Sequence, residues 1–174
     1  MVKVELMAPA GSYESLRAAI NSGADSVYFG VEQLNMRSCS ANNFTISDLK
    51  KIVNICKKRG IKTYLTVNTV LYDHDINLMK KICDAAKKSG VIAIIVSDMA
   101  AIAYARSIGL EVHLSTQVNI SNLETIKFYS QFADVIVLAR ELTLKQIKSI
   151  CEKIKKEKIK GPSGNLVKIE IFAH

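Results

Sequence analysis

Eight polar or charged residues of this chain have the types and positions that could do chemistry. They are Arg37, Asn68, Asp98, His113, Gln117, Arg140, Glu141 and His174. Aspartate and histidine transfer protons, so we predict catalytic roles for Asp98, His113 and His174. Arginine binds carboxylates and phosphates through paired hydrogen bonds, and side-chain amides orient a ligand through neutral ones. We therefore predict that the other five bind ligand: Arg37, Asn68, Gln117, Arg140 and Glu141.

Several of these roles have a structural alternative. His113, Ser115 and Gln117 alternate along a predicted strand, so they would face one side of the sheet. A histidine at such a position is also explained as a buried side chain held by a hydrogen bond. Arg140 and Glu141 also fit a structural ion pair. The sequence leaves both alternatives open.

A repeated pattern of helix, glycine, two residues and strand organises the chain around these residues. It occurs at Gly23, Gly60, Gly90 and Gly109. Glycine readily adopts the left-handed conformation in which many helices end. Two strands joined by a helix run parallel and connect through a right-handed crossover. The pattern therefore predicts a parallel sheet with helices between its strands.

The elements follow from apolar periodicity and from local start and stop signals. Strands are predicted near residues 4–8, 26–30, 63–67, 92–97, 112–115, 135–138 and 167–172. Helices are predicted near residues 13–22, 47–59, 75–89, 99–108, 122–132 and 144–158. Three helix starts carry the spacing of a capping box: Thr45 with Asp48, Ser121 with Glu124 and Thr143 with Gln146.

Strict alternation of strands and helices leaves a doubly wound sheet or an eight-stranded barrel. No Gly-x-Gly-x-x-Gly follows the first strand, and polar residues follow nearly every strand, which favours the barrel. The seventh helix and the eighth strand are missing. We therefore expect residues 1–174 to be a single domain, the N-terminal portion of an incomplete (β/α) TIM-barrel-like fold with about seven parallel strands and six helices. The open strand edges favour self-association into a homo-oligomer.

Composition narrows the class of protein and of partner. The 174 residues are 49% hydrophobic and 23% charged, which is typical of a globular protein. The net charge of +8 favours acidic partners such as RNA, although lysines on predicted helices are more simply explained as solvated outer faces. No apolar run is long enough to span a bilayer and no signal peptide opens the chain. We expect a cytoplasmic protein with no membrane partner.

Metal and protease motifs are missing from the sequence. The four cysteines include no Cys-x-x-Cys pair. Cys56, Cys83 and Cys151 continue apolar helical stripes and are predicted to lie in the core, whereas Cys39 lies in a polar connection. The chain has no His-Glu-x-x-His metal motif and no Gly-x-Ser-x-Gly nucleophile elbow. We predict no metal ligands in this chain.

A set of short motifs, in order along the chain, resembles one known family. The motifs are Glu5-Leu-Met-Ala-Pro-Ala-Gly, Gly23-Ala-Asp-Ser-Val-Tyr-Phe-Gly, Asn35-Met-Arg, Asn42-Asn-Phe, Val67-Asn-Thr, Leu114-Ser-Thr-Gln-Val-Asn and Leu138-Ala-Arg-Glu-Leu. Together they resemble peptidase family U32, the collagenase-like proteins. The resemblance implies a barrel-like N-terminal domain and a protease label with an unassigned catalytic mechanism.

The resemblance also implies a second kind of chemistry. Other members take part in oxygen-independent hydroxylation of tRNA, rRNA or a quinone precursor; they carry an iron–sulfur cluster, and the RNA-modifying members depend on prephenate. In the family the strand ending at His174 continues into a cysteine-rich segment. We therefore expect no cofactor in this chain and an iron–sulfur cluster in the full-length protein.

Three functions remain open at this stage. They are a peptidase acting on peptides, an RNA-hydroxylating enzyme that binds an anionic small molecule such as prephenate, and a non-catalytic binding or scaffold portion or accessory subunit without activity of its own. We expect the isolated chain to be inactive.

Overall fold

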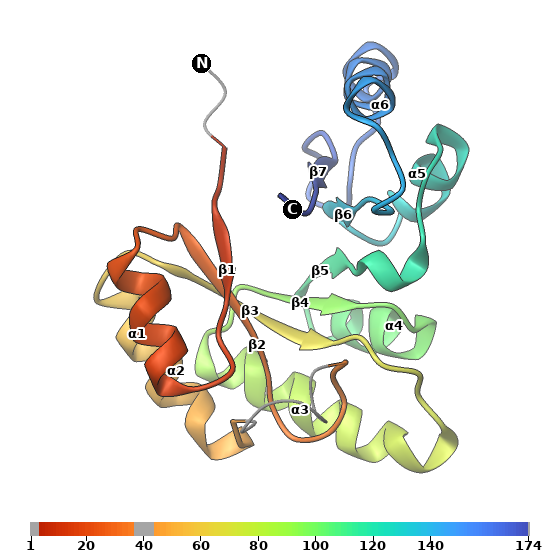
Figure 1. Cartoon of the computed structure of the whole chain (residues 1–174). Coiled ribbons are helices and arrows are strands. Elements are labelled where there is room, and N and C mark those ends of the chain that lie inside the picture. The colour runs from red at the N-terminus through yellow and green to blue at the C-terminus, as the bar shows by residue number, and fades with distance from the viewer. Residues whose placement is uncertain (1–3, 37–43, 174) are drawn as a thin grey trace. The chain divides into compact units, whose positions relative to one another are not determined.

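The computed structural model describes residues 4–36 and 44–173 of the chain. The chain consists of two compact units, Met1–Leu110 and Glu111–His174. Strands and helices alternate along both units (Figure 1).

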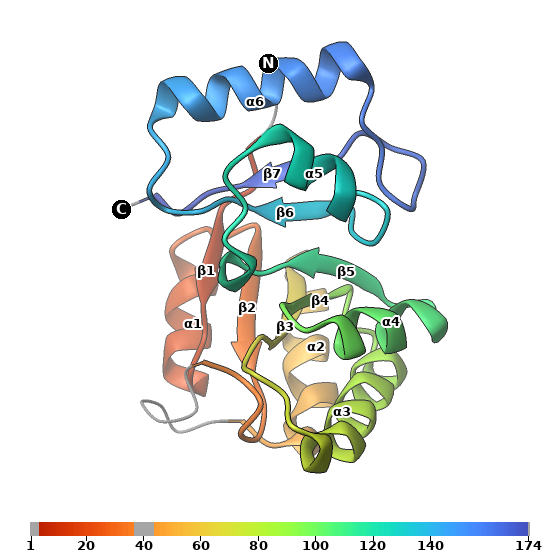
Figure 2. The same ribbon diagram turned by 90° about the vertical axis from the view of Figure 1, so that its right-hand side faces the viewer.

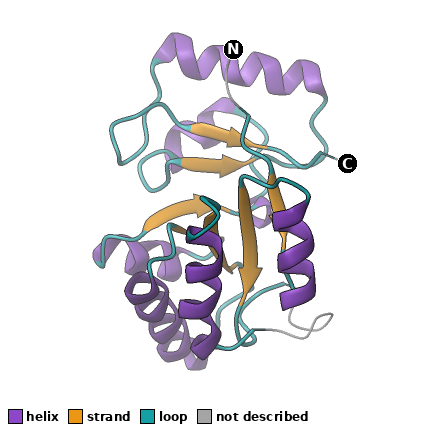
Figure 3. Ribbon diagram, turned by 90° about the vertical axis from the view of Figure 1, so that its left-hand side faces the viewer, coloured by secondary structure: helices purple, strands orange, loops and turns teal. Residues whose placement is uncertain are grey.

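The first unit is built on four parallel strands that lie side by side in sequence order. They are β1 (Met7–Pro9), β2 (Ser26–Gly30), β3 (Lys62–Val67) and β4 (Ala93–Val96). The helices that connect and follow them are α1 (Tyr13–Asn21), α2 (Leu49–Lys57), α3 (Ile76–Ser89) and α4 (Met99–Ser107). Two short 3₁₀ turns precede α2 and α3: η1 (Ile46–Asp48) and η2 (Asp73–Asp75). Helices lie beside the strands of this unit in Figure 3.

Both faces of this sheet are apolar, as expected for a parallel sheet flanked by helices. Tyr64, Ala93 and Ile95 are buried together on one face, where Met7 and Tyr28 pack against them. Side chains alternate along a strand, so buried residues such as Leu65 and Ile94 belong to the other face.

The second unit has three parallel strands, again in sequence order. They are β5 (Glu111–Leu114), β6 (Val135–Val137) and β7 (Lys168–Glu170). A 3₁₀ turn, η3 (Thr116–Val118), and the helices α5 (Leu123–Tyr129) and α6 (Leu144–Glu157) connect them. Figure 2 shows α5 and α6 on the same side of β6 and β7.

Local signals explain where these helices begin and end. Gly90 ends α3 in the left-handed conformation with φ of 84°, and φ is also positive at the other three glycines of the repeated pattern, Gly23, Gly60 and Gly109. The capping boxes of Thr45 with Asp48 and of Thr143 with Gln146 are confirmed.

The predicted capping box at the start of α5 is wrong by one residue. Asn122 caps this helix, and its side-chain oxygen accepts the backbone N–H of Thr125 at 2.9 Å. Asparagine caps a helix at least as well as serine, so it competes successfully with Ser121. Glu124, which the sequence predicts as part of the capping box, forms an ion pair with Lys127 at 2.9 Å.

Within residues 4–36 and 44–173, seven strands alternate with six α-helices, and each unit orders its parallel strands as the sequence does. The α/β, (β/α) TIM-barrel-like class is thereby confirmed. The extent of the domain and its self-association stay predictions. In the described part of the chain, no helix combines the length and apolarity needed to cross a membrane.

Candidate functional site

The connection that follows β2 is attached at both ends to the carboxyl end of that strand. Val31 forms a parallel bridge with Phe44, and the backbone N–H of Glu32 donates to the Phe44 carbonyl at 3.0 Å. The Glu32 carboxylate in turn accepts the backbone N–H of Ile46 at 2.9 Å. The two described ends of this connection therefore lie together where a (β/α) fold places its ligands.

In the described part of this connection Asn35 is a buried polar residue, and only 2% of it is exposed. Its amide nitrogen donates to the carbonyl of Glu32 at 3.2 Å. The side chain lies so close to Gly30 that a Cβ added to Gly30 would lie 2.2 Å from the Asn35 Cγ. Glycine at the end of β2 is thus required for Asn35 to pack there.

Asn35 is absent from the residues that the sequence predicts for the site. The available signal was its place in the motif Asn35-Met-Arg, directly before Arg37. Arg37 itself lies outside the described residues. The burial of Asn35 and its hydrogen bond assign it a positioning role for this connection.

Asn68, predicted to bind ligand, holds the same connection from β3. It directly follows this strand and is half-buried. Its side-chain oxygen accepts the backbone N–H of Met36 at 3.3 Å. Asn68 therefore links the carboxyl ends of β2 and β3, and its predicted ligand contact is untested.

An aromatic cluster anchors the far end of the connection. The ring of Phe44 makes edge contacts with Tyr13 and Phe29, with centroids 5.2 and 5.8 Å away. The Tyr13 hydroxyl donates to the Asp48 carboxylate at 2.7 Å. Burial, and then the neighbouring Asp48 carboxylate, raise the pKa of Tyr13 to about 12. The hydroxyl therefore stays a neutral hydrogen-bond donor at physiological pH.

Asp98, predicted to be catalytic, caps α4. Its carboxylate accepts the backbone N–H of Ala100 at 2.7 Å, which satisfies one of the unpaired donors at this helix start. The carboxylate lies past the carboxyl end of β4, as predicted. A cap role accounts for the residue by itself, and its catalytic role stays a prediction.

In the second unit, His113 and Ser115 are buried, with 3% and 2% of each exposed. The Nε2 atom of His113 lies 3.0 Å from a carboxylate oxygen of Glu111, and the Ser115 hydroxyl accepts the backbone N–H of Gln117 at 3.3 Å. Because β5 ends at Leu114, Gln117 belongs to η3 and is exposed instead of continuing the strand face. These contacts favour the alternative of a hydrogen-bonded buried histidine.

Arg140 and Glu141 follow β6 and are both exposed. Among the described residues they form no ion pair with each other. The Arg140 guanidinium instead lies 5.9 Å from the centroid of the Phe172 ring. His174, the third residue predicted to be catalytic, lies outside the described residues.

The described cysteines do not fit an iron–sulfur cluster, which is held by thiolates. Cys56 and Cys83 are buried in α2 and α3, which confirms the prediction that they belong to the core. Burial raises the pKa of Cys56 to about 11 and that of Cys83 to about 12, so both thiols stay protonated at neutral pH. Cys151 is only half-buried, and Cys39 lies outside the described residues. Residues 4–36 and 44–173 contain no group of three metal-ligating side chains.

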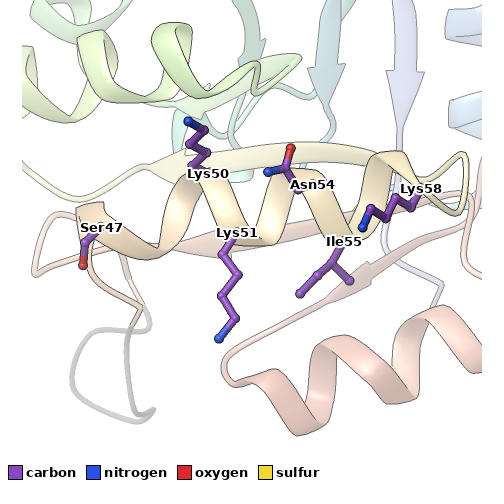
Figure 4. Close-up of a pocket in the computed structure, with 6 residues that line it drawn as sticks. All are labelled: Ser47, Lys50, Lys51, Asn54, Ile55 and Lys58. Carbon is purple, nitrogen blue, oxygen red and sulfur yellow. The ribbon is translucent and has the colours of Figure 1, made fainter.

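A basic surface hollow of about 440 Å³ lies along α2. Its lining residues are Ser47, Lys50, Lys51, Asn54, Ile55 and Lys58. Figure 4 shows Lys50 and Lys51 extending to opposite sides of the helix. Since all six residues belong to α2 or to the residues directly before and after it, the hollow is an open surface that suits an extended anionic partner. We call it the α2 hollow.

Parallel strands in sequence order, with polar side chains fixing the connections at the strand ends, define a (β/α)-barrel type of protein; proteins of this class carry their sites at the carboxyl ends of the strands. The particular family is peptidase family U32, to which the chain belongs: the family model matches residues 11–174. This confirms the resemblance that the motifs indicate.

Known proteins similar to this chain carry two different descriptions. A collagenase of Porphyromonas gingivalis is 63% identical over 98% of this chain and 41% of its own length. The tRNA hydroxylation protein P1 of Bacillus subtilis is 37% identical over 87% of this chain and 36% of its own length. The chain thus spans about two fifths of the length of these relatives.

A solved structure supports the fold. The structure described as that of the U32 peptidase Mk0906 superposes with a TM-score of 0.70 at 16% identity, over 86% of this chain and 65% of its own. At this identity the likeness shows the fold alone.

Proposed function

We propose that this chain is the N-terminal, RNA-binding portion of an enzyme that hydroxylates tRNA or rRNA. The observation that carries the proposal is the α2 hollow, where three exposed lysines line one open surface. The similarity to a tRNA hydroxylation protein supports the same assignment. We also propose a cytoplasmic location, where such RNA substrates occur.

The physical argument rests on counterion release. Each lysine that neutralises an RNA phosphate frees a condensed cation, so binding weakens steeply as salt rises. An open surface lined by Lys50, Lys51 and Lys58 can follow a phosphate backbone, whereas an enclosed pocket would select a small ligand. The chain's net charge of +8 adds a long-range attraction for the negatively charged RNA.

The test measures tRNA binding to the full-length protein by fluorescence anisotropy between 50 and 200 mM salt. Replacing Lys50, Lys51 and Lys58 together by glutamine should weaken binding and reduce the slope of log affinity against log salt by about 2 to 3, since each contact contributes about 0.7 to 0.9. A matched control removes three exposed lysines of α6: Lys145, Lys148 and Lys153. Equal losses in both triple variants, or no salt-dependent binding by the wild type, would contradict the proposal.

For the whole protein we further propose that prephenate, a dicarboxylate, is the anionic small-molecule partner, and that Arg140 contributes to its binding. An exposed guanidinium placed over an aromatic ring is held in position while its N–H donors stay accessible. An iron–sulfur cluster in the full-length protein would take its ligands from residues other than the buried Cys56 and Cys83.

A second candidate function is cleavage of collagen-like or other peptides. The 63% identity to a collagenase favours it. The Ser115 hydroxyl and the His113 Nε2 atom already have partners in Gln117 and Glu111, and a serine peptidase would require them to pair with each other. A peptide-cleavage assay on the full-length protein decides: activity lost on Ser115→Ala would favour the peptidase.

A further inference from the structure

Two exposed aromatic rings are stacked in the connection between β3 and α3. The rings of Tyr72 and His74 are parallel to within 1°, and their centroids lie 5.7 Å apart. Tyr72 is 63% exposed and the side chain of His74 is 80% exposed. An exposed tyrosine of this kind buries little of its own ring, so its presence is not explained by packing within the unit.

Asp75 fixes this pair in place. Its carboxylate accepts the backbone N–H of Tyr72 at 3.0 Å and lies 3.6 Å from the Nε2 atom of His74. The backbone N–H of Asp75 donates back to the Tyr72 carbonyl at 2.8 Å. Asp75 is itself buried at 9% exposure, so the turn that presents both rings is anchored to the body of the unit.

The position of the pair connects it to the candidate site. The connection that carries it leaves the carboxyl end of β3 and leads to α3 (Figure 2). Its first residue, Asn68, holds the connection after β2. Other large apolar side chains are exposed close after the strands at this end of the sheet: Met36 in the connection after β2, Val70 in that after β3, and Met99 at the start of α4. Exposed apolar groups that gather at one end of a sheet mark an interaction surface.

We propose that Tyr72 and His74 form a stacking platform for an unpaired nucleobase of RNA. The proposal rests on the proposed function. The lysines of the α2 hollow would bind the phosphates of an RNA, and the aromatic pair would add a contact to one of its bases. Aromatic side chains stack on any base through its flat face, and removal of one such ring weakens binding by about five- to 150-fold. Because the two side chains are already aligned, they lose little conformational freedom when a base stacks on the exposed face of either ring.

The test compares two RNA probes on the full-length protein by fluorescence anisotropy. One probe is a labelled single-stranded RNA of twelve nucleotides, and the other has the same backbone with abasic sites in its central positions. Tyr72→Ala should weaken binding of the first probe about tenfold and leave the second unchanged. Tyr72→Phe, which keeps the ring, should bind both probes as the wild type does.

A matched control removes an exposed aromatic ring from the other unit. Phe128 of α5 is 55% exposed, and Phe128→Ala should leave both affinities unchanged. If the wild type binds RNA with the expected salt dependence and Tyr72→Ala binds the base-containing probe equally well, the platform is wrong and the proposed function stands. If the wild type binds neither probe, the proposed function and the platform both fail. Loss of collagen-peptide binding in Tyr72→Ala, with RNA binding intact, would identify a peptide as the occupant and overturn the proposal.

Discussion

Replacing Gly30 by alanine tests the packing that positions the connection after β2. The new Cβ would lie 2.2 Å from Cγ of Asn35 and 2.4 Å from its Nδ2, far inside van der Waals contact. Asn35 cannot simply move aside, because only 2% of it is exposed and its amide donates to the Glu32 carbonyl. We expect Gly30→Ala to lower the free energy of unfolding by about 1–3 kcal/mol, the usual cost of overpacking.

A double-mutant cycle separates this clash from other effects of the alanine. Asn35→Ala removes hydrogen bonds worth about 0.5–1.5 kcal/mol each, but it also removes the atoms with which the new Cβ collides. The double variant should therefore be more stable than the sum of the two single losses predicts, by roughly 1 kcal/mol or more. Urea denaturation at 25 °C, monitored by circular dichroism, gives the loss in free energy of unfolding for each single variant and for the double variant.

Two results would refute this reasoning. Gly30→Ala could be as stable as the wild type, which would mean that Asn35 occupies another position. The two losses could also add to within about 0.5 kcal/mol, as they do for independent sites, which would exclude contact between the side chains.

Four further predictions concern the ligand, the pH dependence and the state of the chain. Arg140→Ala should weaken prephenate binding by the full-length protein by about 1.5–3 kcal/mol in titration calorimetry, whereas Lys57→Gln on an outer helix should leave it unchanged. Burial tends to raise the pKa of Glu5, but hydrogen bonds from Lys62 and Tyr64 hold it below its ordinary value. The stability that Glu5 contributes is therefore present above pH 4.5 and is lost as the pH falls through its lowered pKa, so the difference in urea denaturation between Glu5→Gln and the wild type at pH 6 should shrink as the pH is lowered below 4.5. The purified chain should contain no stoichiometric iron or sulfide and should cleave peptides little or not at all; stoichiometric iron would contradict this. Open strand edges should make the chain self-associate, and light scattering that finds only monomer at high concentration would count against it.

The start and end of most elements could be predicted from the sequence, because the contacts that decide them are local. The cap of α6 joins Thr143 to Gln146, three residues away, and Gly90 ends α3 through its own backbone conformation. The alternation of strands and helices then favoured a parallel sheet, since a helical crossover joins parallel strands. One local prediction was wrong: Asn122 caps α5 in place of its neighbour Ser121.

The strand face of His113 and Ser115 could also be predicted from alternation, and both are buried. The role of Gln117 could not, because it depends on where β5 stops. The Ser115 hydroxyl accepts the Gln117 N–H and begins a 3₁₀ turn there, so the side chain of Gln117 leaves the strand face. The contact between His113 and Glu111 likewise favours the role of a hydrogen-bonded buried histidine, and the catalytic role of His113 stays a prediction.

The candidate site depended most on the tertiary structure. Asn68 accepts its hydrogen bond from Met36, which lies 32 positions away in sequence, and Asn35 packs on the end of β2 only because Gly30 leaves room. The sequence by itself determined that polar residues follow the strands of a (β/α) fold. Which of them face a ligand and which hold a neighbouring connection is decided by distances between residues of different strands, and no local pattern contains those distances.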